Sequence, residues 1–107
     1  MLLDIFDGNR DEIQALLIAA LASIQADTRA IIDAAGDNNR DVLLAAAHRL
    51  RGTTGTIGDR RLVAICARIE AEAMSPAASL EPGMRSELRA AVERLAADVA
   101  AYAADGA

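Results

Sequence analysis

Apolar residues recur at steps of three and four along most of this sequence, which is the spacing of one face of an α-helix. After Asn9 the repeat is formed by Ile13, Leu17, Ala20, Ile24, Thr28, Ile31 and Ala35, and it stops at Gly36. The repeat predicts a helix of about 27 residues, roughly 40 Å long. Alanine, the best helix former, supplies 26 of the 107 residues, and only two are proline, so little interrupts helices in this chain.

Glycine, proline and capping residues mark where the other helices begin and end. Residues 37–41 offer N-cap candidates for a second helix, and Gly58-Asp59 combines a C-terminal glycine with a new N-cap. A third helix presents Leu62, Ile65, Cys66, Ile69 and Ala73 on one face, and a last helix, after a loop at residues 74–83, presents Leu88, Val92, Leu95, Val99 and Tyr102. Pro82 suits the first turn of that last helix.

Four amphipathic helices with mostly short connections predict an all-α fold, an antiparallel four-helix bundle. The apolar residues 2–6, which Gly8 ends, predict a short extra N-terminal helix, and Asn9 with Glu12 predicts the N-cap of the long helix that follows. The length of the chain suggests one core, so we expect residues 1–107 to form a single domain.

Charge and composition exclude several classes of partner. The net charge of −5 disfavours nucleic acid, although residues 42–70 form a basic island with five arginines against two acids. No uninterrupted apolar run reaches the roughly 18 residues of a membrane span. The opening MLLDIFDGNRDE has neither a basic nor an apolar region of a signal peptide. We therefore expect no membrane association, a cytoplasmic location and a monomer.

The single histidine, His48, lies in the second predicted helix. Because a helix turns about 100° per residue, the large apolar residues fall on the side opposite His48: Val42, Leu43, Ala46, Leu50 and Ile57. We therefore expect His48 to face solvent. This orientation argues against a buried core histidine, and a surface histidine without a function is the alternative.

Two glycines share the predicted face of His48. Gly52 and Gly55 follow it by one and two turns, and each mid-helix glycine costs about 0.5–1 kcal/mol relative to alanine. We expect them to leave a bare surface on which another protein approaches the imidazole. A frayed helix end is an alternative that suits Gly55 better than Gly52.

Other neighbours on this face suggest docking and chemistry. Leu44 and Ala45 are candidate docking contacts, although scattered surface aliphatics are common. Arg51, three residues after His48, places on the same face a permanent charge that binds phosphate oxygens. A free histidine side chain is mostly neutral at pH 7 and keeps a lone pair on one nitrogen. The pair predicts a nucleophile beside an anion-stabilising group, whereas one histidine and one cysteine make a poor metal site.

The segment AHRLRGTTGTIGDRRLVAICARIE, residues 47–70, resembles the histidine-containing phosphotransfer (HPt) domain family. That family's pattern runs His-x-Leu-Lys-Gly, then small residues, a glycine, a leucine four residues on, a cysteine and Leu-Glu. It falls here on His48, Leu50, Arg51, Gly52, Thr53, Thr54, Gly58, Leu62, Cys66, Ile69 and Glu70. Arg51 replaces the usual lysine, and Ile69 replaces a leucine.

The resemblance implies a four-helix bundle with a short preceding helix and an exposed phosphoacceptor histidine, His48. It implies that Arg51 stabilises the phosphoryl group, that the domain has no kinase activity of its own, and that the partners are receiver domains of response regulators. A hybrid sensor histidine kinase is a further candidate partner. The Mg²⁺ that the reaction uses would be bound by the receiver, and Cys66 would be a buried core thiol.

Two alternatives to this function remain open on the sequence. One is a helical interaction module that docks receiver or kinase partners through the same face without being phosphorylated. The other is the dimerisation domain of a sensor kinase, which needs an ATP-binding domain for which 107 residues leave no room.

Overall fold

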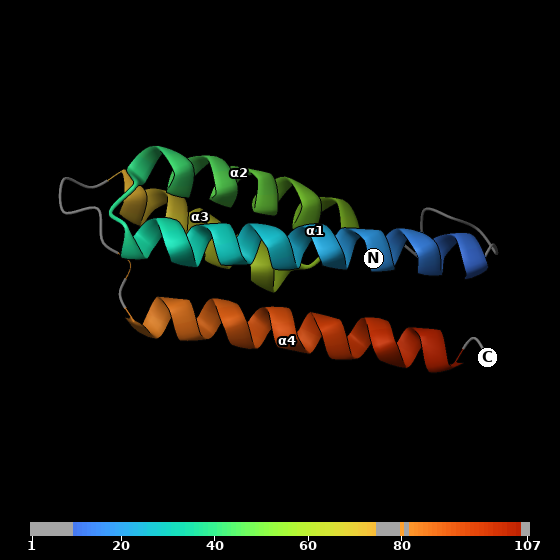
Figure 1. Cartoon of the computed structure of the whole chain (residues 1–107). Helices are drawn as coiled ribbons and strands as arrows, with labels where there is room; N and C mark the ends of the chain where they lie inside the picture. Colours follow the sequence, from blue (N-terminus) through green and yellow to red (C-terminus); the bar gives the residue numbers. More distant parts are fainter. Residues whose placement is uncertain (1–9, 75–79, 81, 106–107) are drawn as a thin grey trace.

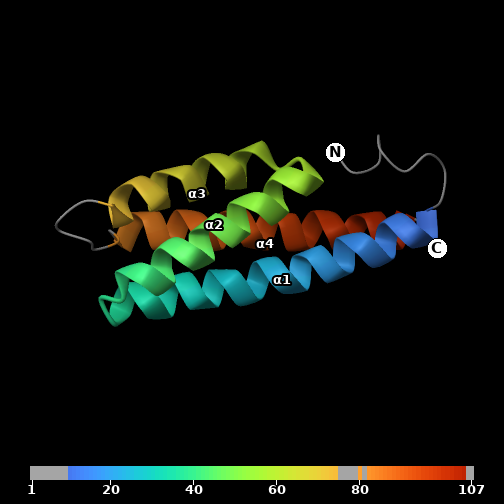
Figure 2. The ribbon, with the colours of Figure 1, turned by 90° about the horizontal axis from the view of Figure 1, so that it is seen from above.

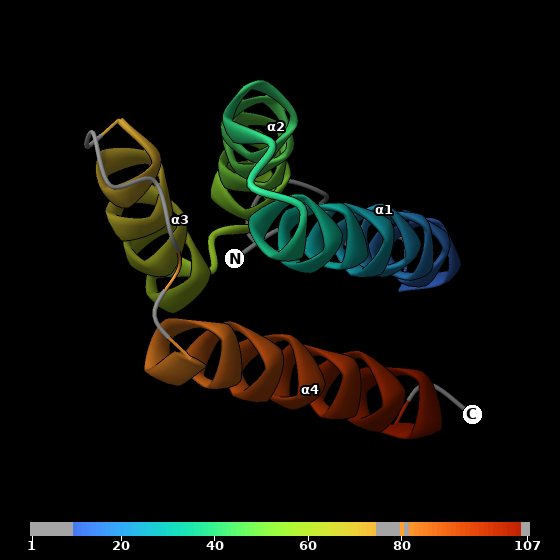
Figure 3. The same cartoon turned by 60° about the vertical axis from the view of Figure 1, so that its left-hand side comes forward.

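The computed structural model describes residues 10–74, 80 and 82–105. Within them lie four helices, α1 (Arg10–Gly36), α2 (Arg40–Ile57), α3 (Arg60–Ala73) and α4 (Pro82–Asp105). Successive helices run in opposite directions around a common centre (Figures 1 and 3). The predicted antiparallel four-helix bundle is therefore confirmed, and α1 has the predicted 27 residues. The expected short helix at residues 2–6 and the N-cap at Asn9 lie outside the described residues.

The turns between the first three helices form where the capping residues predicted them. Asn38 adopts a left-handed φ of 54° after α1, and the side chain of Asn39 accepts a hydrogen bond from the Val42 amide to cap α2. Gly58 ends α2 with a φ of 80°, and the side chain of Asp59 caps α3 by accepting from the Leu62 amide at 3.1 Å. This two-residue turn folds α3 back along α2 as a hairpin (Figure 2).

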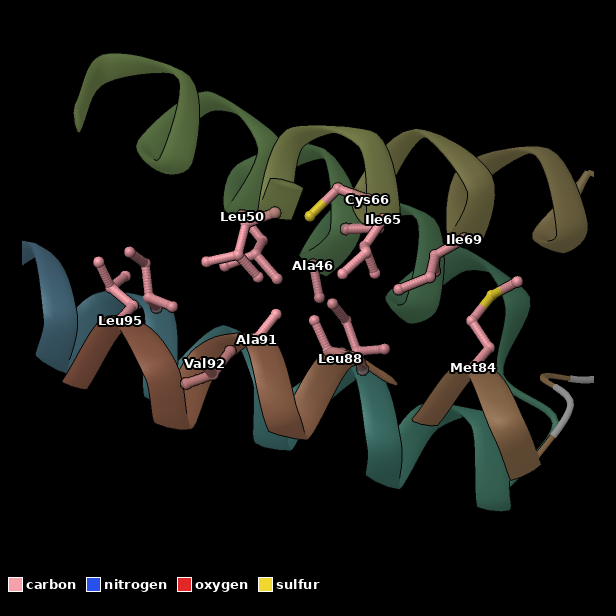
Figure 4. Packing of buried hydrophobic residues seen from close by; sticks show 14 of the residues in the cluster. Ala46, Leu50, Ile65, Cys66, Ile69, Met84, Leu88, Ala91, Val92 and Leu95 are labelled. Atoms are coloured by element: carbon pink, nitrogen blue, oxygen red, sulfur yellow. The ribbon is translucent and has the colours of Figure 1, made fainter. Parts of the chain in front are cut away.

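The core consists of the predicted apolar stripes. Leu50 and Ala46 of α2, Ile65 and Ile69 of α3 and Leu88 of α4 point toward one another in Figure 4, and all are almost completely buried. In α1, six of the seven predicted stripe residues are buried: Ile13, Leu17, Ile24, Thr28, Ile31 and Ala35. The periodicity of the sequence therefore located the core faces of all four helices.

Two residues of α2 differ from the sequence expectation. Val42, predicted on the buried side, is 44% exposed, because it lies in the first turn of the helix and at the edge of its apolar face. Leu44, predicted to be exposed beside His48, is half-buried and packs against the core, because it lies on the side of α2 that turns toward α3. Helical periodicity therefore predicts the burial of residues at the centre of an apolar face, but not of residues at its edges.

Helix α1 has the length and composition of a membrane span, with a mean hydropathy of 1.5 over its most apolar window. No uninterrupted apolar run in α1 reaches about 18 residues, because Gln14, Ser23 and Gln25 interrupt it. A mostly buried core helix of a soluble protein passes the same test, whereas 22% of this window is buried. Here α1 packs along α2 and α4 (Figure 3), and it buries the polar residues Asp27 and Thr28.

Candidate functional site

His48 lies near the middle of α2 on the face that points away from the core. Its side chain is 73% exposed, whereas Leu50, two residues later, is completely buried. Leu43, Ala46 and Ile57 are also buried, so the helical phase that the sequence predicted for α2 is correct around His48. The imidazole is held on a rigid helix and is accessible to a second macromolecule.

Glu70 of α3 contacts the imidazole from the neighbouring helix. The Oε1 atom of Glu70 lies 3.3 Å from Nδ1 of His48, and the Glu70 side chain is only 17% exposed. We assign the proton of the neutral imidazole to Nδ1, because a carboxylate only accepts hydrogen bonds. The lone pair is then on Nε2, and no hydrogen bond to Nε2 is found among the described residues. The carboxylate therefore orients the ring with its nucleophilic nitrogen free.

Arg51 belongs to the same cluster, as its position three residues after His48 predicted. Its Nη1 donates to Oε2 of Glu70 at 2.8 Å, and its Nη2 lies 3.5 Å from Nδ1 of His48. The guanidinium side chain is 41% exposed. Glu70 thus uses one carboxylate oxygen for His48 and the other for Arg51.

In the sequence Glu70 matches the last position of the family pattern, and no role was predicted for it. The contact joins residues 22 positions apart, so it depends on how α3 packs against α2. One signal was present in the sequence: Glu70 is the only acid besides Asp59 in the basic island, and Asp59 is the cap of α3. An acid retained among five arginines is a candidate partner for one of them.

The surface around Gly52 and Gly55 is open, as predicted. Both glycines are helical and exposed. A Cβ atom added to Gly52 would meet nothing within 4 Å, and one added to Gly55 would meet only Val63 Cγ2, at 4.0 Å. Packing within the chain therefore does not require either glycine. Ala45 is also exposed on this side of α2.

Arg49, beside His48, is tied to α1. Its Nε donates to Oδ1 of the buried Asp27 at 3.3 Å, and its side chain is 58% exposed. A groove of about 600 Å³ follows this side of α2, with Asp27, Arg49 and Gly52 among its lining residues. Residues of α1 and Gly52 therefore line the same groove, so a molecule bound at Gly52 would also contact α1.

Cys66 is completely buried in the core, as predicted. Burial, with a smaller contribution from the nearby Glu70 carboxylate, raises the pKa of its thiol to about 12. At neutral pH the thiol is therefore protonated and is not a nucleophile. Among the residues in the described ranges, no group of three or more histidine, cysteine or acidic side chains is arranged to hold a metal ion.

Comparison with known proteins identifies the family of the chain. No curated protein and no solved structure matches the chain. The family model of the Hpt domain matches residues 4–98, which include all four of the helices described above except the last residues of α4. Hpt domains are helical phosphotransfer modules of two-component signalling, and they interact with receiver domains and kinases. The chain belongs to the Hpt domain family.

Proposed function

We propose that the chain is a phosphorelay intermediate that accepts a phosphoryl group on Nε2 of His48 from a receiver aspartate and passes it to another receiver aspartate. The observation that carries the proposal is the exposed His48 ring with Glu70 on its Nδ1 edge. This contact fixes the tautomer that leaves Nε2 with its lone pair pointing to solvent. A surface histidine without a function would not require a contact with a carboxylate of the next helix that is only 17% exposed.

The transfer step needs little from this chain beyond a positioned nucleophile. The Nε2 lone pair attacks phosphorus in line, the bond between phosphorus and the aspartate oxygen breaks, and the electron pair leaves on the receiver's carboxylate. The imidazole gains positive charge, which the Glu70 carboxylate stabilises through the proton on Nδ1. The Mg²⁺ for the reaction belongs to the receiver in this proposal, and the reverse step returns the phosphoryl group to an aspartate.

The receiver docks over the bare helical surface at Gly52 and Gly55, with Ala45 beside it. A side chain at Gly52 would stand one turn from the imidazole, where the acidic face of a receiver has to come close. Residues 42–70 carry five arginines against two acids, and this net positive charge is complementary to that face, although Arg49, Arg51 and Arg68 also pair with carboxylates of this chain. Leu44 contributes less to docking than an exposed residue would, because it is half-buried.

We further propose that the protein is cytoplasmic and monomeric, and that its partners are response regulators and a hybrid sensor histidine kinase. It has no nucleic-acid or membrane partner in this proposal. It does not phosphorylate itself with ATP in this proposal, because a receiver or a kinase supplies the phosphoryl group to His48.

The test is transfer from a phosphorylated receiver to the purified chain. We expect acid-labile, base-stable label on the wild type and none on His48→Gln. The exposed position of His48 predicts that this variant changes the free energy of unfolding by about 0.5 kcal/mol or less, so the loss would not be due to misfolding. Binding of the receiver without any label on His48 would instead identify the chain as a non-catalytic interaction module.

A further inference from the structure

Arg51 is not free to meet a phosphoryl group in the described arrangement. Its guanidinium forms a 2.8 Å ion pair with Glu70, and this pair lies on the Nδ1 edge of the imidazole. The phosphoryl group forms on Nε2, the nitrogen that faces solvent. Arg51 therefore has to exchange Glu70 for the phosphoryl group before it can stabilise phospho-His48.

The exchange is opposed by a strong contact. The Glu70 side chain is 17% exposed, against 41% for Arg51 and 73% for His48, so the carboxylate is the best shielded member of the cluster. An ion pair with one half-buried partner is screened less by solvent than a surface pair is. If Arg51 left, Glu70 would keep only its contact with His48 among the interactions described above, and this raises the free energy of the phosphorylated state.

We propose that Glu70 is a positioning residue that withholds Arg51 from the phosphoryl group and thereby sets how easily phospho-His48 gives the group up. This inference rests on the proposed role of His48 and adds to it a determinant of the phosphotransfer equilibrium. A relay intermediate must release what it accepts. A phosphohistidine held by an unopposed guanidinium would be a poor donor to the next aspartate.

Glu70 has a second effect of opposite sign, which the test has to separate. Its carboxylate accepts the Nδ1 proton and stabilises the positive ring of phospho-His48, whereas its hold on Arg51 destabilises the phosphorylated state. Glu70→Gln removes the charge on which both effects depend. The amide oxygen still accepts from Nδ1, but it no longer stabilises the positive ring by its charge, and it no longer holds Arg51 in an ion pair. Only the second effect requires Arg51, so it disappears in the background of Arg51→Met.

The experiment is a double-mutant cycle on the equilibrium between phospho-His48 and a phosphorylated receiver. The equilibrium constant is measured for the wild type, Glu70→Gln, Arg51→Met and the double variant. We expect Glu70→Gln to favour phospho-His48 by about fivefold more when Arg51 is present than when it is absent, a coupling within the usual range for contacting residues. Independent effects would overturn the inference, and so would a coupling of the opposite sign.

The chain offers a matched control for the loss of an arginine–carboxylate pair. Arg68 of α3 donates to Glu87 of α4 at 2.8 Å, the same distance as in the Arg51–Glu70 pair. Glu87→Gln therefore removes an interhelical ion pair of the same length that does not include His48, although its carboxylate is 37% exposed against 17% for Glu70. We expect its transfer equilibrium to equal that of the wild type. A shift as large as that of Glu70→Gln would mean that a general change in the bundle causes both.

A spectroscopic measurement tests the exchange without any receiver. Phosphoramidate is used to phosphorylate His48 chemically, and the ¹³C resonance of the Glu70 side-chain carboxyl is followed. We expect phosphorylation to move this resonance toward its position in unphosphorylated Arg51→Met, because Arg51 has left. An unmoved resonance overturns the inference even if a receiver labels His48. Movement without labelling by any receiver would instead refute the proposed relay function.

Discussion

The inner and the outer face of the α2–α3 hairpin differ in how closely their residues are packed. On the inner face Leu50, Leu62, Cys66 and Ile69 are completely buried, and each side chain is constrained by its neighbours. On the outer face α2 carries two helical glycines around which there is open space. The inner face is therefore explained by packing within the chain, whereas no packing contact within 4 Å accounts for Gly52 on the outer face.

The difference makes Gly52 the position at which the proposed docking partner would be expected to influence the sequence. A glycine inside a helix costs about 0.5–1 kcal/mol relative to alanine, and nothing within 4 Å of Gly52 would obstruct a methyl group. The stability of the isolated chain would favour alanine, the residue that this sequence uses most often. A position that departs from the local optimum without a local reason is a candidate for an interface.

The largest expected effect on stability comes from the inner face. Leu50→Ala should lower the free energy of unfolding by about 2–5 kcal/mol, because it leaves a cavity among completely buried residues. Val42→Ala, in the same helix but 44% exposed, should change it by about 0.5 kcal/mol or less. Urea denaturation followed by circular dichroism measures both. Equal effects of the two substitutions would show that the two faces of α2 are not distinct.

Most of the fold could be predicted because each helix carries its own signals. The steps of three and four identified the buried faces, and Gly58 with Asp59 identified the turn between α2 and α3, since both act within a few residues. Val42 and Leu44 were placed wrongly because they lie at the edges of the apolar face. Their exposure depends on the angle at which neighbouring helices pack, and sequence spacing does not contain that angle.

The site could be predicted only where its residues share a helix. His48, Arg51, Gly52 and Gly55 all lie on α2, so their common face follows from helical geometry alone. The contact with Glu70 crosses to α3, and the pairing of Arg49 with Asp27 crosses to α1. Both depend on how the helices pack together. The sequence therefore predicted the exposed histidine and the open surface beside it, but not the carboxylate that contacts the ring.

The second prediction concerns the outer face and assumes the proposed function. Gly52→Gln should slow transfer from a phosphorylated receiver by about tenfold or more, equivalent to about 1.4 kcal/mol in the barrier, because the side chain occupies the docking surface. Labelling by phosphoramidate should stay within about twofold of wild type, since a small donor needs no docking surface. Gly36→Gln, at another open and exposed helical glycine, is the control. If receiver and phosphoramidate rates both stay at wild-type values in Gly52→Gln, Gly52 is not part of the docking surface.

The third prediction returns to the inner face and uses pH. The pKa of Cys66 is raised to about 12 in the folded chain from an ordinary value of 9.0. Above pH 9 the unfolded chain therefore loses the thiol proton while the folded chain keeps it, so stability falls as pH rises. The stability advantage of wild type over Cys66→Ala should shrink by about 1.4 kcal/mol between pH 8 and pH 10. A constant difference would contradict the burial of the thiol.

The smallest effect expected is also the sharpest test of the comparison between the two faces, because its sign is unusual. Gly52→Ala should stabilise the isolated chain by up to about 1 kcal/mol, since alanine restricts the unfolded chain and fits the helix without a clash. Gly58→Ala, six residues later, should destabilise it by about 1–2 kcal/mol, because its φ of 80° is left-handed. Thermal unfolding of both variants against wild type measures the two signs. Destabilisation by Gly52→Ala would mean that the chain itself requires this glycine, and Gly52 would then not indicate a docking partner.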